Sequence, residues 1–254
     1  MISLYASAIK IQFWQEIYER LNASNEPFEL IFAGFNPPDF VLPDNFKFIY
    51  TRAKSATAAE MARRECKGDF IIPAVDDWMF PTNMLKLFMN EYNQLEDKKT
   101  MISAWYGNQW MWVSEATHRL NANDPDLILP LFPMLSVEYQ KIIGGIDKRF
   151  NVTMWDLDLY LRFRRIGGKL KFVGRPAPET LVGNFEFGRE SVQTDDCVIV
   201  WEKPNTCTYL NNPEHMRLGG EDHLLFRQLW GADGRLERTT PVEEYSDEEL
   251  KKYL

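Results

Sequence analysis

The sequence predicts an α/β fold with a mixed, mostly parallel, Rossmann-like sheet flanked by helices. Over the first two-thirds of its 254 residues, short apolar runs alternate with amphipathic helical patterns, the order expected of βαβ units. Several of these runs are continuously apolar, which is typical of strands buried on both faces of a parallel sheet. The 45% apolar content excludes wholesale disorder, and no internal repeat is present. We therefore predict a single domain over residues 1–235, followed by a charged tail over 236–254.

The predicted strands are the apolar segments at 2–8, 28–35, 46–50, 69–75 and 169–173. Pro73 is unexpected in a central strand, so we expect a bulge or an early strand end there.

Helices are predicted where apolar residues recur every three or four positions, as at 14–21, after Pro81 and at 222–230. Another helix is expected to open with a capping box formed by Thr57 and Glu60.

The amino-acid composition disfavours several classes of partner and of structural site. The net charge of −8, from 29 basic and 37 acidic residues, disfavours nucleic acid as a partner. The three cysteines are odd in number and far apart, which excludes a disulfide framework and leaves open a single Cys197–Cys207 bridge. They include no C-x-x-C pair, which disfavours structural zinc. Neither a signal peptide nor an apolar stretch long enough to span a membrane is evident. We expect a soluble, cytoplasmic protein, which leaves room for peripheral association with a membrane.

Two adjacent carboxylates, Asp76 and Asp77, follow the apolar run at 69–75. Ligands of parallel α/β sheets bind outside the carboxyl ends of the strands. Paired carboxylates there suit a hard divalent ion such as Mg²⁺ or Mn²⁺. The alternative is a solvated turn in which one aspartate caps the next helix.

Another pair, Asp156 and Asp158, lies at the start of a predicted helix. Thr153 precedes Asp156 by three residues, which is the capping-box spacing, and Asp158 precedes Arg162 by four, which favours a helix ion pair. The alternative is that Asp156 faces a cleft and acts as a general base.

Three motifs in order resemble family 2 glycosyltransferases of the GT-A fold, the fold of nucleotide-diphospho-sugar transferases. They are CKGDFIIPAVDD at 66–77, IGGIDKRF at 143–150, and WDLDLYLR at 155–162 with GGKLKF at 167–172. The resemblance implies metal-dependent, inverting transfer of a sugar from a nucleotide-diphosphate sugar to an acceptor hydroxyl. Residues 1–98 would form the nucleotide-sugar-binding half and 99–235 the acceptor-binding half. The acceptor, a glycan, a lipid-linked molecule or a small molecule, is left open.

The resemblance also implies roles for individual residues. Asp156 matches the catalytic base, while Trp155 and Asp158 lie at acceptor positions. The metal, Mn²⁺ or Mg²⁺, would be held by Asp76 and Asp77, and His215 is a further candidate ligand. Donor-binding positions are Ser7, Ala8, Gly34 and Asp76.

This sequence departs from the family pattern at three positions. Ala74 replaces the first Asp of the D-x-D motif, Gly34 stands where an Asp often contacts the base, and Trp155 replaces a Glu. These departures keep open a non-catalytic relative that binds a nucleotide sugar or a glycan. A nucleotidyltransferase is disfavoured, because residues 1–12 contain no Gly and one Lys and so lack a loop to cradle a triphosphate.

Overall fold

The computed structural model describes residues 1–108, 111–112, 130, 132–173, 198–201, 212–231 and 237–254. Its main sheet has the strand order β3-β2-β1-β4-β8. The strands are β1 (Ile2–Ser7), β2 (Phe28–Gly34), β3 (Phe46–Tyr50), β4 (Phe70–Pro73) and β8 (Leu135–Ser136). The first four are parallel, and β8 pairs antiparallel with β4. The predicted mixed, mostly parallel sheet is confirmed.

Side chains on these strands alternate between two hydrophobic cores. Leu4 and Ala6 of β1 point into one core, whereas Tyr5 between them points into the other. Both sets are buried, as expected for a sheet that is covered on both faces. β4 ends at Pro73, which agrees with the expected early end of that strand.

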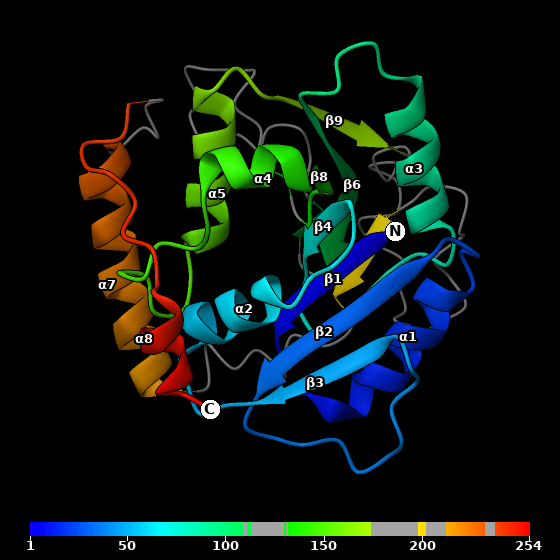
Figure 1. The fold of residues 1–254 in the computed structure, drawn as a ribbon, viewed down its shortest axis with the longest axis horizontal. Helices are drawn as coiled ribbons and strands as arrows, with labels where there is room; N and C mark the ends of the chain where they lie inside the picture. The colour runs from blue at the N-terminus through cyan, green and yellow to red at the C-terminus, as the bar shows by residue number, and fades with distance from the viewer. Residues whose placement is uncertain (109–110, 113–129, 131, 174–197, 202–211, 232–236) are drawn as a thin grey trace.

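Helices cover both faces of the sheet (Figure 1). The short turn η1 (Ile11–Phe13) leads into α1 (Trp14–Asn22), which shares the first core with α3 (Met84–Gln94). The second core contains α2 (Ser55–Arg64), α5 (Trp155–Arg165) and α7 (Pro213–Trp230). α4 (Val137–Ile143) links β8 to the loop before α5.

Small residues bring α2 close to the sheet. Ala58 and Ala62, four residues apart on α2, are buried in the second core.

A second set of strands extends the layer formed by the main sheet. β6 (Thr100–Asn108) pairs in parallel with β9 (Lys169–Val173) and with β10 (Val198–Trp201). β5 (Trp78–Met79) and β7 (Met111–Trp112) pair antiparallel with β10 and β6, respectively.

Both predicted capping boxes are wrong. α2 begins at Ser55, so Thr57 lies inside the helix, and its hydroxyl is 2.7 Å from the Tyr245 hydroxyl. α5 begins at Trp155, and the residue before it, Met154, has a left-handed backbone with φ 64°. Thr153 is therefore not the N-cap of α5.

The C-terminal segment is packed instead of forming a loose charged tail. α8 (Asp247–Lys251) opens with a complete capping box between Ser246 and Glu249. Tyr245 and Leu250 are buried against Met61 of α2. Figure 1 shows α7 and α8 on the side of α2 that faces away from α1 and α3.

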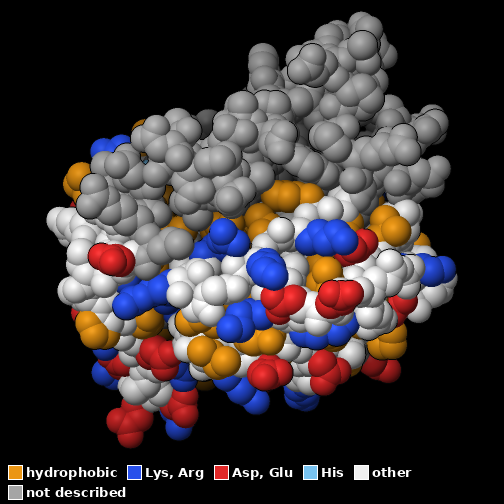
Figure 2. Space-filling view, turned by 90° about the horizontal axis from the view of Figure 1, so that it is seen from above, with side chains coloured by type: hydrophobic (Ala, Val, Ile, Leu, Met, Phe, Trp, Pro, Cys, Tyr) orange, Lys and Arg blue, Asp and Glu red, His pale blue; other side chains and the backbone are white. Residues whose placement is uncertain are grey.

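Across the described ranges, no helix combines the length and the apolar character that crossing a bilayer requires. On the face shown in Figure 2, the described part of the surface intermixes acidic and basic side chains instead of presenting one sign of charge.

Candidate active site

Asp76 anchors the loop that follows β1. One of its oxygens, Oδ2, accepts hydrogen bonds from the backbone N–H groups of Ile9 and Lys10. The same oxygen accepts the Trp14 indole N–H at 3.1 Å. Burial raises the pKa of Asp76, although the hydrogen bonds from the loop oppose that rise. The carboxylate thus lies at the N-terminal end of the η1–α1 helical segment, where negative charge is favourable.

Asp77 forms an ion pair with the Lys10 ammonium. The two side chains are 12% and 11% exposed, respectively, so this contact is largely shielded from solvent. The ion pair joins the turn after β4 to the loop after β1. Lys10 is a site residue that sequence reasoning missed, because nothing in the local pattern pairs it with an aspartate 67 positions away.

The aspartate pair does not fit the predicted divalent metal in this arrangement. A cation shared by both carboxylates would have to displace the Lys10 ammonium from Asp77, and on Asp76 it would compete with three N–H donors at Oδ2. Within the described part of the chain, no three His, Cys, Asp or Glu side chains cluster so that they could hold a metal ion. His215, in the first turn of α7, is therefore not gathered with Asp76 and Asp77 as predicted.

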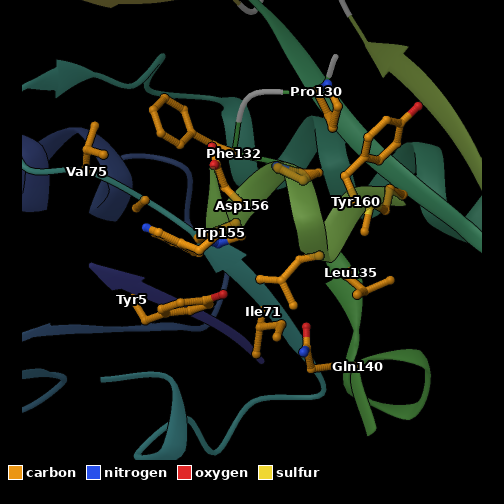
Figure 3. Close-up of a pocket in the computed structure, with 15 residues that line it drawn as sticks. Tyr5, Ile71, Val75, Pro130, Phe132, Leu135, Gln140, Trp155, Asp156 and Tyr160 are labelled. Carbon is orange, nitrogen blue, oxygen red and sulfur yellow. The ribbon is translucent and has the colours of Figure 1, made fainter. Parts of the chain in front are cut away.

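Asp156 lies in the first turn of α5 and lines a pocket at the carboxyl end of β4 (Figure 3). Ala74 and Val75, next to the aspartate pair in sequence, line the same pocket. The remaining lining is mostly apolar and includes Phe132, and the pocket encloses about 50 Å³, enough for a few water molecules. Burial raises the pKa of Asp156, while backbone N–H groups of its own helix turn oppose the shift. A half-buried carboxylate with a raised pKa, facing a pocket, is suited to accept a proton.

Trp155 and Tyr5 form one wall of this pocket. Their ring centroids are 6.5 Å apart with a 36° tilt, and both rings are buried. The Tyr5 hydroxyl has no hydrogen-bond partner among the described residues, and burial raises its pKa. Figure 3 shows both rings on one side of the pocket, with the Asp156 carboxylate beside Phe132. Trp155, predicted from the sequence to lie at an acceptor position, thus lines this pocket, and Tyr5 is a lining residue that sequence reasoning missed.

The predicted donor-binding positions lie at the carboxyl ends of β1 and β2. Ser7 ends β1, and the Ala8 N–H continues the ladder to Ala33 at 2.9 Å. Gly34 lies so close to Ala8 that an added Cβ would be 1.9 Å from the Ala8 carbonyl oxygen. The glycine therefore allows β2 and the end of β1 to approach closely, and a side chain at position 34 has no room.

Asp158 does not face an acceptor, contrary to the sequence prediction. The side chain is fully buried, and its Oδ2 accepts Arg162 Nε at 2.9 Å, confirming the predicted helix ion pair. Its Oδ1 accepts Trp230 Nε1 and Arg238 Nε. Asp158 is therefore part of the buried scaffold behind the pocket.

Neither a protein-family model nor a curated protein matches this sequence. Among solved structures, the chain is similar to the mannosyltransferase PcManGT from Pyrobaculum calidifontis, in complex with GDP-Man and Mn²⁺. The TM-score is 0.55 at 12% identity, over 91% of this chain and 71% of that one. The fold is GT-A-like.

Weaker matches include S. aureus TarS, with a TM-score of 0.49 at 12% identity over 68% of this chain. A TarS 1–349 structure in complex with UDP has the same TM-score at 11% identity. This chain spans 35% of the first TarS chain and 57% of the second. At 12% identity, the likeness to the mannosyltransferase concerns the fold alone.

Proposed function

We propose that this protein is a glycosyltransferase that moves a sugar from a nucleotide-diphosphate sugar to an acceptor hydroxyl. The observation that carries the proposal is the position of Asp156, a carboxylate with a raised pKa in the pocket at the carboxyl end of β4. In α/β sheets of this kind, that end of the strands is where ligands bind. The similar mannosyltransferase, which was solved with GDP-Man, supports a sugar nucleotide as the donor.

In the proposed reaction, Asp156 accepts the proton of the acceptor hydroxyl as the oxygen attacks the anomeric carbon of the donor. The bond from that carbon to the diphosphate breaks, and the nucleoside diphosphate leaves with the bonding electrons. Because one direct displacement reverses the face of attack, the product has inverted configuration. The raised pKa makes Asp156 a stronger base than an exposed aspartate, provided that it is ionised.

In this proposal, the donor binds near the ends of β1 and β2, and the acceptor binds at the pocket. Ser7, Ala8 and the backbone of Gly34 lie where the donor would bind, and Trp155 lies on the acceptor side. The similar mannosyltransferase holds Mn²⁺, and the sequence predicts a divalent metal here too. Asp76 and Asp77 are engaged by Lys10 and by the loop N–H groups in this structure.

The test is release of nucleoside diphosphate from a panel of uridine, guanosine and thymidine diphosphate sugars, with sugar, glycan and lipid-linked acceptors. Asp156→Asn keeps the shape of the side chain but cannot take a proton. We expect it to lose roughly 10²–10⁴-fold in kcat while nucleotide binding persists. Asp44→Asn, at an exposed turn position, is the matched control and should retain full activity. Transfer by Asp156→Asn within a few-fold of wild type would refute the assignment of the base.

The alternative is a GT-A-like protein that binds a nucleotide sugar without transferring it. It is favoured by Ala74, a buried apolar residue where the resembled family carries a carboxylate. Binding of a nucleotide sugar with no turnover on any acceptor would select this alternative.

A further inference from the structure

Lys10 contacts both members of the aspartate pair that the sequence predicts to hold a metal ion. Its ammonium forms an ion pair with Asp77, and its own backbone N–H donates to Asp76. One lysine therefore contacts both carboxylates, with its backbone on one and its side chain on the other. The buried Trp14 of α1 donates its indole N–H to Asp76 and so adds a further contact to this arrangement.

The charges at this point of the fold explain why a cation is already present. Two carboxylates that are mostly buried side by side repel each other, and the Asp77 charge adds to the rise in the pKa of Asp76. The Lys10 ammonium offsets one of the two negative charges, and the loop N–H dipoles stabilise the other. Replacing this set by a divalent ion would leave the Lys10 ammonium buried without a carboxylate partner, which is costly.

We propose that Lys10 supplies the positive charge that holds the donor diphosphate, so that the protein binds its donor without a divalent metal. This inference rests on the proposed function, since it assumes that a nucleotide-diphosphate sugar is the donor. An ammonium has three N–H donors, so Lys10 can keep its contact with Asp77 and still donate to phosphate oxygens. It lies in the loop after β1, at the carboxyl end of the parallel strands, which is where ligands of such sheets bind.

Asp76 and Asp77 have different positioning roles in this proposal. Asp76 accepts the backbone N–H groups of Ile9 and Lys10 and the indole N–H of Trp14, so it fixes the position of the Lys10 backbone. Asp77 holds the ammonium itself. Both carboxylates bind protein N–H groups in this proposal, whereas in the metal-bridged arrangement that the sequence predicts they would bind the metal ion.

The first experiment measures binding of uridine and guanosine diphosphates by calorimetry, in EDTA and in Mn²⁺. We expect wild-type protein to bind one of them in EDTA with a Kd close to that in Mn²⁺. Lys10→Met should weaken diphosphate binding by roughly tenfold or more, the usual size of a lost charge-assisted hydrogen bond. Its affinity for the matching nucleoside without phosphates should stay unchanged. Lys47→Met, which removes an exposed lysine paired with Glu65, is the matched control and should bind like wild type.

A second variant separates a direct role of Lys10 from simple neutralisation of Asp77. Lys10→Met alone leaves Asp77 without its ammonium partner, and this can disturb the loop. The double variant Lys10→Met/Asp77→Asn removes both charges, so the loop loses the unbalanced carboxylate. If Lys10 contacts the phosphates, the double variant still binds the diphosphate weakly. Recovery of wild-type affinity in the double variant would overturn the proposal.

The outcomes also distinguish this inference from the proposed function. Diphosphate binding that requires Mn²⁺ in the wild-type protein overturns the Lys10 assignment and leaves the transferase proposal standing. If no nucleoside diphosphate or nucleotide sugar binds with or without Mn²⁺, both proposals fail. Binding in EDTA with no transfer to any acceptor supports Lys10 and contradicts the transferase.

Discussion

Arg238 and Asp158, eighty residues apart in the sequence, form a buried ion pair with Arg238 Nε 3.0 Å from Asp158 Oδ1. The two side chains are 2% and 0% exposed. Arg238 also pairs with the buried Asp147 in the loop before α5. Through this one guanidinium, the segment after α7 is joined to the helix that carries Asp156.

We expect Arg238→Met to destabilise the fold by about 3–5 kcal/mol, because it leaves two buried carboxylates short of a cation. Arg217→Met is the matched control, since Arg217 also pairs with two carboxylates but is 55% exposed. That change should cost about 0–1 kcal/mol. Urea unfolding followed by circular dichroism compares the two. Equal midpoints for both variants would show that the buried pair contributes no more than an exposed one.

The contribution of Asp147 to the free energy of unfolding should become smaller at acidic pH. Burial by itself would raise the pKa of this carboxyl, but hydrogen bonds from Arg149 and Arg238 lower it to about 2, below its ordinary value of 3.8. Because the folded pKa is the lower one, the stabilisation is complete above about pH 4 and is lost as the pH falls toward 2. The difference in unfolding free energy between wild type and Asp147→Asn should therefore shrink by about 1 kcal/mol from pH 6 to pH 3. A difference that is constant over that range would contradict the lowered pKa.

Gly34→Ala should be strongly destabilising, since the new Cβ would lie 1.9 Å from the Ala8 carbonyl oxygen, a backbone atom that cannot rotate away. We expect a loss of about 1–3 kcal/mol or more. The control is Gly220→Ala in α7, where an added Cβ meets nothing within 4 Å. That change should stabilise the helix by up to about 1 kcal/mol. Thermal melting of both variants checks the contrast, and a Gly34→Ala melt at or above wild type would refute the close approach.

The rate of transfer should fall in acid at a higher pH than an exposed aspartate would require. Asp156 must be ionised to accept a proton, and burial raises its pKa above the ordinary 3.8. We therefore expect kcat/KM to decline as the pH falls through a value above that of an ordinary aspartate, with the same decline in Asp44→Asn. The measurement is a pH profile with the best donor of the panel. An acid limb at or below the ordinary aspartate value would mean that Asp156 is not the base.

The local pattern of the sequence predicted the strands of the main sheet well, because apolar runs and their lengths are properties of neighbouring residues. β1, β2 and β3 lie within one residue of the predicted segments, and β4 ends at Pro73. The fold class followed from the same alternation. The carboxylates Asp76 and Asp156 were also marked out by sequence alone, through their places after a strand and at the start of a helix.

Helix starts were predicted less well, since a capping box needs a particular backbone at its first residue and free side chains at both ends. In α2, the Thr57 hydroxyl contacts Tyr245 from the C-terminal segment, and Glu60 pairs with Arg63 and Arg64. The C-terminal segment itself looked like a charged tail, because its few apolar residues find their partners on α2, far away in the sequence.

Sequence alone thus determined the α/β class, the strand positions and the candidate carboxylates, all of which depend on short-range patterns. The tertiary structure alone decided what those carboxylates contact. β4 lies beside β1 in the sheet, and this neighbourhood brings Asp77 to Lys10 across 67 residues and directs Asp76 to the loop after β1. A pairing of that kind depends on strand order, which no local spacing encodes. The physical consequence is that the two carboxylates predicted to hold a metal contact Lys10 and the N–H groups of the loop after β1 in this structure.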